Sequence, residues 1–177
     1  MGSRPNTNFA YIAGFLDGDG SLMLQIKKRK DGRCKLRFMC TICMYQDSRH
    51  EQTLFWMRKI FGIGYISKRK DEISELRING FNQVKDILLN LLPHIRFKKL
   101  QARALYKVAC LLSEKSIQNL SKTDLRHLID YVLIIQNKNY VTKYKKVGKN
   151  FGFVRFDPVT TVSRCYIGID FWNVSQG

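Results

Sequence analysis

Two runs of alternating apolar and polar residues, 21–30 and 35–45, flank the dipeptide Asp31-Gly32 and constrain the fold more than any other feature. Alternation with a period of two is typical of a β-strand with one buried face and one polar face. Asp-Gly between two such runs is a preferred sequence for a tight turn. The sequence therefore predicts an antiparallel hairpin with an apolar face and a polar, basic face.

The remaining segments indicate how this hairpin is covered. Helical spacing of apolar residues predicts helices at 9–16, 49–61, 82–91, 98–112 and 123–137, with Asn6-Thr7-Asn8 as the N-cap of the first and Gly62 ending the second. Short strands are expected at 65–69 and 73–78. This order predicts an α+β fold in which helices cover one face of a four-stranded antiparallel sheet.

The charge balance points to a polyanionic partner. The chain has 31 Lys and Arg residues against 14 Asp and Glu, a net charge of +17. Such an excess attracts polyanions and makes binding sensitive to salt. Nucleic acid is the expected partner. A membrane is not expected, because no long apolar run and no dominant basic amphipathic helix is found.

Five cysteines are present, and because Met-Gly-Ser-Arg-Pro lacks the apolar core of a signal peptide, we expect no secretory signal. We expect reduced thiols and an intracellular, reducing compartment, either an organelle or a prokaryotic cytoplasm. Cys40 and Cys43 form a C-x-x-C pattern, but odd spacing in a strand sends them to opposite faces. They are interpreted as structural thiols rather than zinc ligands.

The segment from Tyr11 to Gly20, YIAGFLDGDG, carries the chemistry. Small residues spaced along the preceding helix allow a second helix backbone to approach closely, and the alternative is a tight contact of helix on sheet. Asp17 and Asp19 stand at the helix C-terminus, where negative charge is unfavourable unless a cation offsets it. The expected contact residues of the stripe are Ala10, Ala13, Gly14 and Gly18.

Residues 12–20, IAGFLDGDG, resemble the signature of the LAGLIDADG homing endonucleases. The resemblance continues through the hairpin, the turn at 62–65 and the segment 92–102, and covers roughly residues 8–137. It implies an αββαββα core whose polar sheet face forms a saddle on DNA. It also implies that two signature helices pack side by side and that their terminal acidic residues bind divalent metals at the scissile phosphates.

Carried onto this sequence, the resemblance makes Asp19 the metal ligand, with the carbonyl of Gly18 as a second contact and Asp17 as a local structural residue. Because the signature occurs once, two chains are needed, so we expect a homodimer and a pseudo-palindromic double-stranded DNA target. The expected cofactor is Mg²⁺, for which Mn²⁺ or Ca²⁺ substitutes, Ca²⁺ without cleavage. Carboxylates and carbonyls are ligands suited to such ions.

Family members also carry polar and basic residues around the attacking water. By the same resemblance Gln46 takes the polar position and Lys98 the basic one, with Lys99 the alternative. A second basic position is filled here by His50 or Arg49. Without the resemblance, Gln46 is a polar residue at a strand end and Lys98 a solvated lysine at a helix start.

The polar sheet face is the predicted DNA-reading surface, because Gln suits adenine, Arg suits guanine and Glu accepts a hydrogen bond from cytosine. The alternative is a merely solvated basic face. The residues assigned to this surface are Met23, Gln25, Lys27, Arg29, Lys35, Arg37, Met39, Thr41, Tyr65, Ser67, Arg69, Glu75 and Arg77.

Residues 138–177 differ from the rest: 138–156 are basic and aromatic, and 160–172 are rich in β-branched and aromatic residues. We expect an endonuclease core at 1–137 and an extension at 138–177 that packs on the core or contacts DNA. The predicted activity is metal-dependent hydrolysis of both DNA strands, encoded within a mobile intron. The alternatives are a non-cleaving protein of the same fold, either an intron RNA maturase or a DNA-binding regulator, and a basic RNA- or ribosome-binding domain.

Overall fold

The computed structural model describes residues 4–28 and 36–138. The predicted turn at Asp31-Gly32, with Arg29 and Lys35 on either side of it, and the extension beyond residue 138 lie outside the described residues. The elements in chain order are α1 (Arg4–Asp19), β1 (Gly20–Lys28), β2 (Leu36–Asp47), the 3₁₀ helix η1 (Ser48–His50), α2 (Gln52–Phe61), β3 (Tyr65–Lys68), β4 (Ile73–Asn79), α3 (Phe81–Leu91), α4 (Lys99–Glu114), η2 (Ile117–Asn119) and α5 (Lys122–Lys138).

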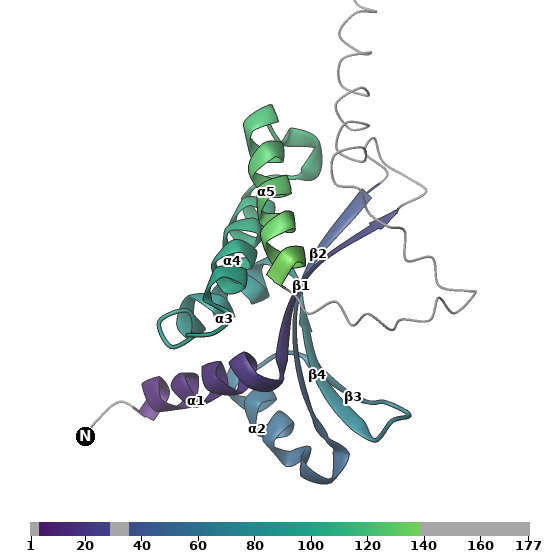
Figure 1. The fold of residues 1–177 in the computed structure, drawn as a ribbon, viewed down its shortest axis with the longest axis vertical. Coiled ribbons are helices and arrows are strands. Elements are labelled where there is room, and N and C mark those ends of the chain that lie inside the picture. The colour runs from purple at the N-terminus through teal and green to yellow at the C-terminus, as the bar shows by residue number, and fades with distance from the viewer. Residues whose placement is uncertain (1–3, 29–35, 139–177) are drawn as a thin grey trace, which may run out of the picture.

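The four strands form one antiparallel sheet in the order β1-β2-β4-β3. The described helices lie on one side of this sheet (Figure 1). The predicted α+β fold with a four-stranded antiparallel sheet is therefore confirmed. The register pairs Leu22 with Ile42 and Leu24 with Cys40, so the two alternating runs put their apolar sets on the same face.

The core lies between this apolar face and the helices. Each strand of the central pair contributes alternate residues, and the helices contribute residues spaced by three or four, because one face of each element is apolar. The fully buried large side chains include Ile12, Leu16, Leu22, Ile42, Met44, Leu54, Met57, Leu76, Ile78, Leu88, Leu91 and Ile95.

The start of α1 differs from the prediction. The helix begins at Arg4 rather than at residue 9, so the expected N-cap at Asn6-Thr7-Asn8 is wrong. Pro5 explains the difference, because proline is well tolerated in the first turn of a helix, where its missing N–H has no partner to lose. The polar residues that suggested a cap are instead part of the helix.

Two glycines fix the ends of elements. Gly62 ends α2 in the left-handed conformation, with φ of 68°, and its N–H donates to the Arg58 carbonyl oxygen at 2.9 Å, as predicted. Gly20 makes the change from α1 to β1. A Cβ atom at this position would lie 2.8 Å from both the Cα and the carbonyl oxygen of Leu16, so no larger residue fits without a backbone shift.

Cys40 and Cys43 lie on opposite faces of β2, as predicted, since Cys40 pairs with Leu24 and Cys43 with Ser21. Both are buried. Burial raises the pKa of each thiol to about 12, so both remain protonated near neutral pH. In the part of the chain that the structure describes, no helix is long and apolar enough to cross a membrane.

Candidate active site and nucleic-acid interface

The C-terminal end of α1 and the segment before α4 are joined by a pair of reciprocal caps. Asp17 Oδ2 accepts hydrogen bonds from the backbone N–H groups of Arg96 and Phe97 at 2.8 and 3.0 Å, and Oδ1 accepts from that of Lys98 at 2.8 Å. The Asp17 carboxylate thus binds three donors just before α4 begins. The interpretation of Asp17 as a structural residue agrees with this geometry.

Lys98 in turn binds the C-terminal end of α1 through its side chain. Its Nζ donates to the carbonyl oxygens of Leu16, Gly18 and Gly20 at 2.8, 3.3 and 2.7 Å. The ammonium group therefore lies at the negative end of α1, where a cation is favourable. Lys98 is half-buried and held in place, so the interpretation of a freely solvated lysine is wrong for this residue.

The pKa values of the two residues reflect this arrangement. Partial burial raises the pKa of Asp17, but the hydrogen bonds from the Lys98, Arg96 and Phe97 backbones and the Lys98 charge outweigh it, so its pKa lies below the usual value. Burial lowers the pKa of Lys98, and the charges of Asp17 and Asp19 offset part of that effect. Asp17 is therefore a carboxylate at neutral pH and accepts from all three donors.

Asp19, two residues further on, is exposed at the end of α1. With the carbonyl of Gly18 it offers two oxygen donors, the ligand type that Mg²⁺ and Ca²⁺ prefer. Among the described residues, no cluster of three or more His, Cys, Asp and Glu side chains is placed to hold a metal ion. The donor set thus fits a divalent cation in chemical type, and the described part of one chain supplies only part of a coordination shell.

Ala10, Gly14 and Gly18 form an exposed stripe along α1. A Cβ atom added at Gly14 or Gly18 would meet nothing within 4 Å. The predicted contact residue Ala13 does not belong to this stripe, because it is fully buried in the core. The reason is the helical period: each residue is rotated about 100° from the one before it, so Ala13 points to the side of the stripe, toward the core.

A shallow, open hollow lies between α1 and α2. The hollow, of about 570 Å³, is lined by Thr7, Asn8, Tyr11, Gln52, Thr53 and Trp56. Tyr11 is 55% exposed, and its ring meets the edge of Trp56 with the ring centroids 5.6 Å apart. The exposed surface of α1 is therefore open along much of its length within one chain.

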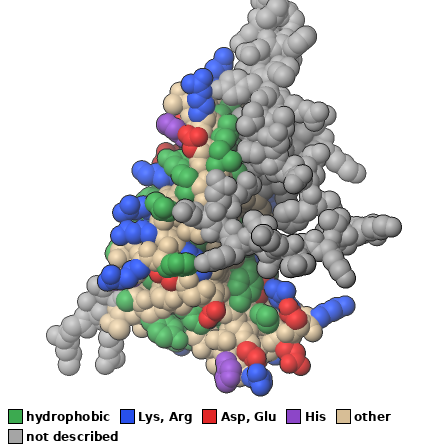
Figure 2. Space-filling view, in the orientation of Figure 1, with side chains coloured by type: hydrophobic (Ala, Val, Ile, Leu, Met, Phe, Trp, Pro, Cys, Tyr) green, Lys and Arg blue, Asp and Glu red, His purple; other side chains and the backbone are tan. Residues whose placement is uncertain are grey.

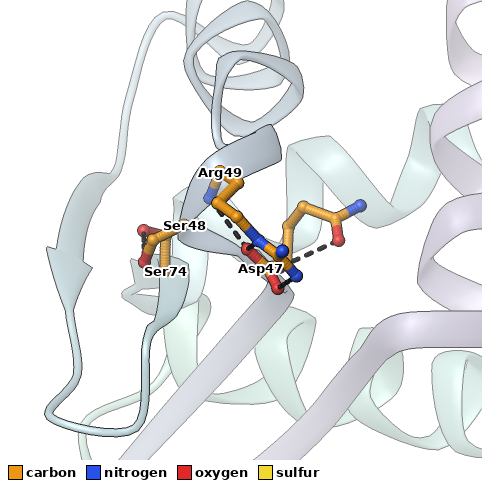
Figure 3. Close-up of polar contacts among 5 residues, drawn as sticks. Asp47, Ser48, Arg49 and Ser74 are labelled. Carbon is orange, nitrogen blue, oxygen red and sulfur yellow. Dashed lines mark hydrogen bonds and ion pairs between the residues drawn. The ribbon is translucent and has the colours of Figure 1, made fainter.

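The residues after β2 form a compact polar turn. Arg49 lies against Asp47 (Figure 3), with Nε 3.0 Å from Oδ1 and Nη2 2.8 Å from Oδ2. These hydrogen bonds lower the pKa of Asp47. Both carboxylate oxygens of Asp47 bind the guanidinium group of Arg49, so the Arg49 side chain is held against its own turn. His50 is exposed. The choice between Arg49 and His50 as the second basic group stays open.

The same turn is tied to the β3–β4 hairpin. The hydroxyl oxygens of Ser48 and Ser74 are 2.9 Å apart (Figure 3), and Ser74 donates to Glu51 Oε2 at 2.6 Å. Lys68 Nζ lies 2.9 Å from Glu51 Oε1. These contacts join η1, β3 and β4 at this end of the sheet.

Gln46 stands two residues beyond Met44, which pairs with Gly20. It therefore lies at the end of the sheet where α1 meets β1. Its Oε1 accepts a hydrogen bond from the Asp47 N–H at 2.9 Å. The fold brings the predicted site residues Asp19 and Lys98 together at the end of α1, and it places Gln46 at the same end of the sheet.

The predicted polar surface is one face of the sheet, turned away from the helices. The register pairs Met23 with Thr41 and Gln25 with Met39, then Tyr65 with Arg77 and Ser67 with Glu75. Lys27 pairs with Arg37 in the same alternation. Arg69, whose N–H donates to the carbonyl oxygen of Ile73 at 2.8 Å, continues the pattern after β3.

Two residues of this face are not free to contact a base. Thr41 is buried and donates to Asn79 Oδ1 at 2.8 Å. Glu75 is 5% exposed, accepts from the Cys43 thiol at 3.4 Å and forms an ion pair with Arg77. The prediction that Thr41 and Glu75 contact DNA directly is therefore wrong as to their role, because their polar atoms are used within the sheet.

The sequence interpretation missed several members of this face. Ser21, Cys43, Tyr45 and Asn79 continue the same alternation, and Ser21 Oγ lies 3.3 Å from the Tyr45 hydroxyl. Continuing the period of two to the end of β2 would have found Cys43 and Tyr45. Basic residues also occur on the helical side and near the β3–β4 end (Figure 2), so the net charge is not confined to the sheet.

Comparison with known proteins agrees with this fold. The family model of LAGLIDADG endonucleases matches residues 12–108, more than half of the chain. The DNA endonuclease I-CvuI of Chlorella vulgaris is 32% identical over 100 residues, which are 56% of this chain and 62% of that protein. The DNA endonuclease I-CreI of Chlamydomonas reinhardtii is 28% identical over 109 residues, 61% of this chain and 66% of that protein. The chain thus spans less than two thirds of the length of each.

Among solved structures, I-CvuI in complex with the I-CreI target and 2 mM Mg, with the DNA not cleaved, matches with a TM-score of 0.70 and 25% identity, over 94% of this chain and 96% of that one. I-CvuI with its own target and 2 mM Ca gives a TM-score of 0.71 at 24% identity, over 93% and 96% of the two chains. The fold is that of the homing endonucleases. This protein belongs to the LAGLIDADG endonuclease family.

Proposed function

We propose that this protein is a homodimeric, site-specific DNA endonuclease that hydrolyses one phosphodiester bond in each strand with the help of a divalent metal, Mg²⁺. The observation that carries the proposal is the exposed Asp19 carboxylate at an end of α1 that Lys98 and Asp17 hold in place. Family membership and the naming of both relatives as DNA endonucleases support it.

Asp19 and the Gly18 carbonyl are the groups that would hold the metal. A divalent ion held there supplies charge relief on the phosphoryl oxygens and a more acidic bound water. Lys98 contributes in two ways from its place between three carbonyl groups. It fixes the backbone that carries Asp19, and it adds positive charge beside the phosphate position.

The homodimer follows from the single carboxylate. Asp17 is bound by the segment before α4, so Asp19 is the exposed carboxylate left at the end of α1, and two cuts in opposite strands require two such groups. The exposed stripe of Ala10, Gly14 and Gly18 supports close packing of two α1 helices, since nothing in the chain itself lies against Gly14 or Gly18. A two-fold symmetric dimer favours a target whose two halves are related by the same symmetry.

The polar face of the sheet would lie on the DNA. A two-stranded ribbon fits the major groove, and Gln25, Arg37 and Arg77 have the side chains that hydrogen-bond to base edges. The net charge of +17 supplies the sequence-independent attraction to phosphates.

The test is selection of cleaved sites from a randomised DNA library in Mg²⁺, comparing wild type with Asp19→Asn. We expect the wild type to cut both strands of a defined site and Asp19→Asn to bind the same site in Ca²⁺ without cutting it in Mg²⁺. Asp130→Asn, which removes an exposed carboxylate on α5 and not on the polar sheet face, is the charge-matched control and should cut normally.

Selective binding by the wild type without cutting in any divalent metal would contradict the nuclease proposal. Cutting by Asp19→Asn at the wild-type rate would contradict the assignment of the site. Sedimentation of the protein–DNA complex should give two chains on each target, and one chain would contradict the homodimer.

A further inference from the structure

Three side chains on the polar sheet face form a connected unit that the proposed chemistry does not use. Glu75 Oε1 accepts from the Cys43 thiol at 3.4 Å and from Arg77 Nε. Cys43 and Arg77 are paired across β2 and β4, and Glu75 stands two residues before Arg77 on the same face. The unit therefore crosses from one strand of the sheet to the next.

The burial of the three side chains decreases toward Arg77. Cys43 is fully buried, the Glu75 side chain is 7% exposed and that of Arg77 is 28% exposed. A carboxylate so far from water is stable only when it is paired and hydrogen-bonded. The outermost part of the unit is the end of the guanidinium group.

The nitrogen of Arg77 that Glu75 binds determines which guanidinium N–H groups remain for a ligand. The contact is at Nε, on the stem side of the guanidinium, and within residues 4–28 and 36–138 no hydrogen bond holds the terminal Nη1 and Nη2 groups, which leaves them to a ligand. These two groups form a planar fork, and that fork matches the O6 and N7 acceptors of guanine in the major groove. The thiol adds a donor to the same carboxylate, since burial keeps Cys43 protonated.

The negative charge of Glu75 distinguishes between two possible roles of Arg77, which are binding a phosphate and reading a base. An arginine that serves a phosphate works through its positive charge, which a carboxylate on the same group would largely cancel. An arginine that reads a base works through the direction of its donors, which a buried carboxylate fixes. Glu75 therefore favours recognition of a base over attraction to the backbone.

We propose that Arg77 is a specificity-determining residue that reads one guanine in each half of the target, and that Glu75 and Cys43 are positioning residues for its guanidinium group. The inference rests on the proposed function for DNA as the ligand and for two chains on a two-fold target, and not on cleavage. Glu75 itself would make no base contact.

The experiment measures binding in Ca²⁺ to the selected target and to variants with each base pair of both half-sites replaced symmetrically. Wild type, Arg77→Lys, Glu75→Gln and Cys43→Ser are compared, with Asp71→Asn as the control for loss of a carboxylate near an arginine. Arg77→Lys keeps the charge and loses the fork. Cys43→Ser keeps a donor to Glu75.

We expect the wild type to prefer guanine at one position of each half-site by roughly 5- to 150-fold, the range of a bidentate contact. Arg77→Lys should lose that preference and keep the others. Glu75→Gln should weaken the preference at the same position without lowering overall affinity, because it removes a negative charge. Cys43→Ser and Asp71→Asn should retain it. The double variant of Glu75→Gln and Arg77→Lys should behave as Arg77→Lys alone.

Retention of the guanine preference by Arg77→Lys, or a loss of affinity that is equal for all sequences, would overturn the inference, because a phosphate contact gives no preference for one base pair. An effect of Glu75→Gln at a different base pair would also overturn it. If Glu75→Gln does not fold, the position-specific result of Arg77→Lys still decides. Selective binding without cleavage in Mg²⁺ would contradict the proposed nuclease function and leave this inference standing.

Discussion

Replacement of Asp17 tests the reciprocal caps that hold the end of α1. Asp17→Asn leaves one acceptor oxygen where two oxygens now accept three backbone hydrogen bonds, at 2.8, 3.0 and 2.8 Å. The new amide NH₂ group must face at least one N–H donor. With a net value of about 1 kcal/mol per hydrogen bond, and a reduction for the partial exposure of Asp17, we expect a loss of roughly 1.5–3 kcal/mol in the free energy of unfolding.

The assay is urea denaturation at a fixed protomer concentration, because a dimer makes stability depend on concentration. Asp71→Asn is again the control, since Asp71 pairs with Arg69 in an exposed turn and its loss should change stability little. A loss below about 0.5 kcal/mol for Asp17→Asn would refute the capping argument.

The same substitution predicts a dependence on pH. The pKa of Asp17 is lower in the folded protein than its ordinary value of 3.8, so its contribution is fully present above that value. It is lost as pH falls through the folded pKa. The difference between wild type and Asp17→Asn should therefore be constant from neutral pH down to about pH 5 and shrink below 3.8. A difference that grows on acidification would contradict the assignment of a lowered pKa.

Three further predictions concern the packing of α1 and the thiols. Gly14→Leu should leave the single chain folded, because a Cβ there meets nothing within 4 Å, and should abolish the dimer in sedimentation; an intact dimer would exclude this face. Gly20→Ala should lower the free energy of unfolding by about 1–3 kcal/mol in urea denaturation, since its Cβ would lie 2.8 Å from the Leu16 backbone; no loss would contradict that contact. Cys40 and Cys43 should resist alkylation at pH 8 in the folded protein while Cys110, which is partly exposed, reacts first among these three; mass spectrometry of the peptides measures the order, and early modification of Cys43 would contradict its burial.

Much of the fold was predictable because it depends on local periodicity. The alternation in β1 and β2 predicted both faces of the sheet, and Gly62 predicted the end of α2. The start of α1 was mispredicted because three polar residues resemble a cap, whereas Pro5 in the first turn lets the helix begin earlier.

The site was predictable only in part. Asp19 and Lys98 followed from the family resemblance, but the contact between Lys98 and the end of α1 joins residues about 80 positions apart, which no local pattern contains. Ala13 was misassigned because a small residue on the buried side of a helix looks the same in sequence as one on its open side. Glu75 was assigned to a base because its partner Cys43 is 32 residues away.

The central claim is that one chain carries half of the catalytic site, and mixed dimers test it most directly. Wild type and Asp19→Asn chains are co-expressed with different tags in varied proportions, so that they pair at random, and double-strand cleavage is measured in Mg²⁺ against the wild-type fraction. If both Asp19 residues are required, cleavage follows the square of that fraction, and an equal mixture retains roughly one quarter of the activity. Activity that falls in simple proportion to the wild-type fraction, to roughly one half in the equal mixture, would mean that each chain cuts both strands by itself and would contradict the account.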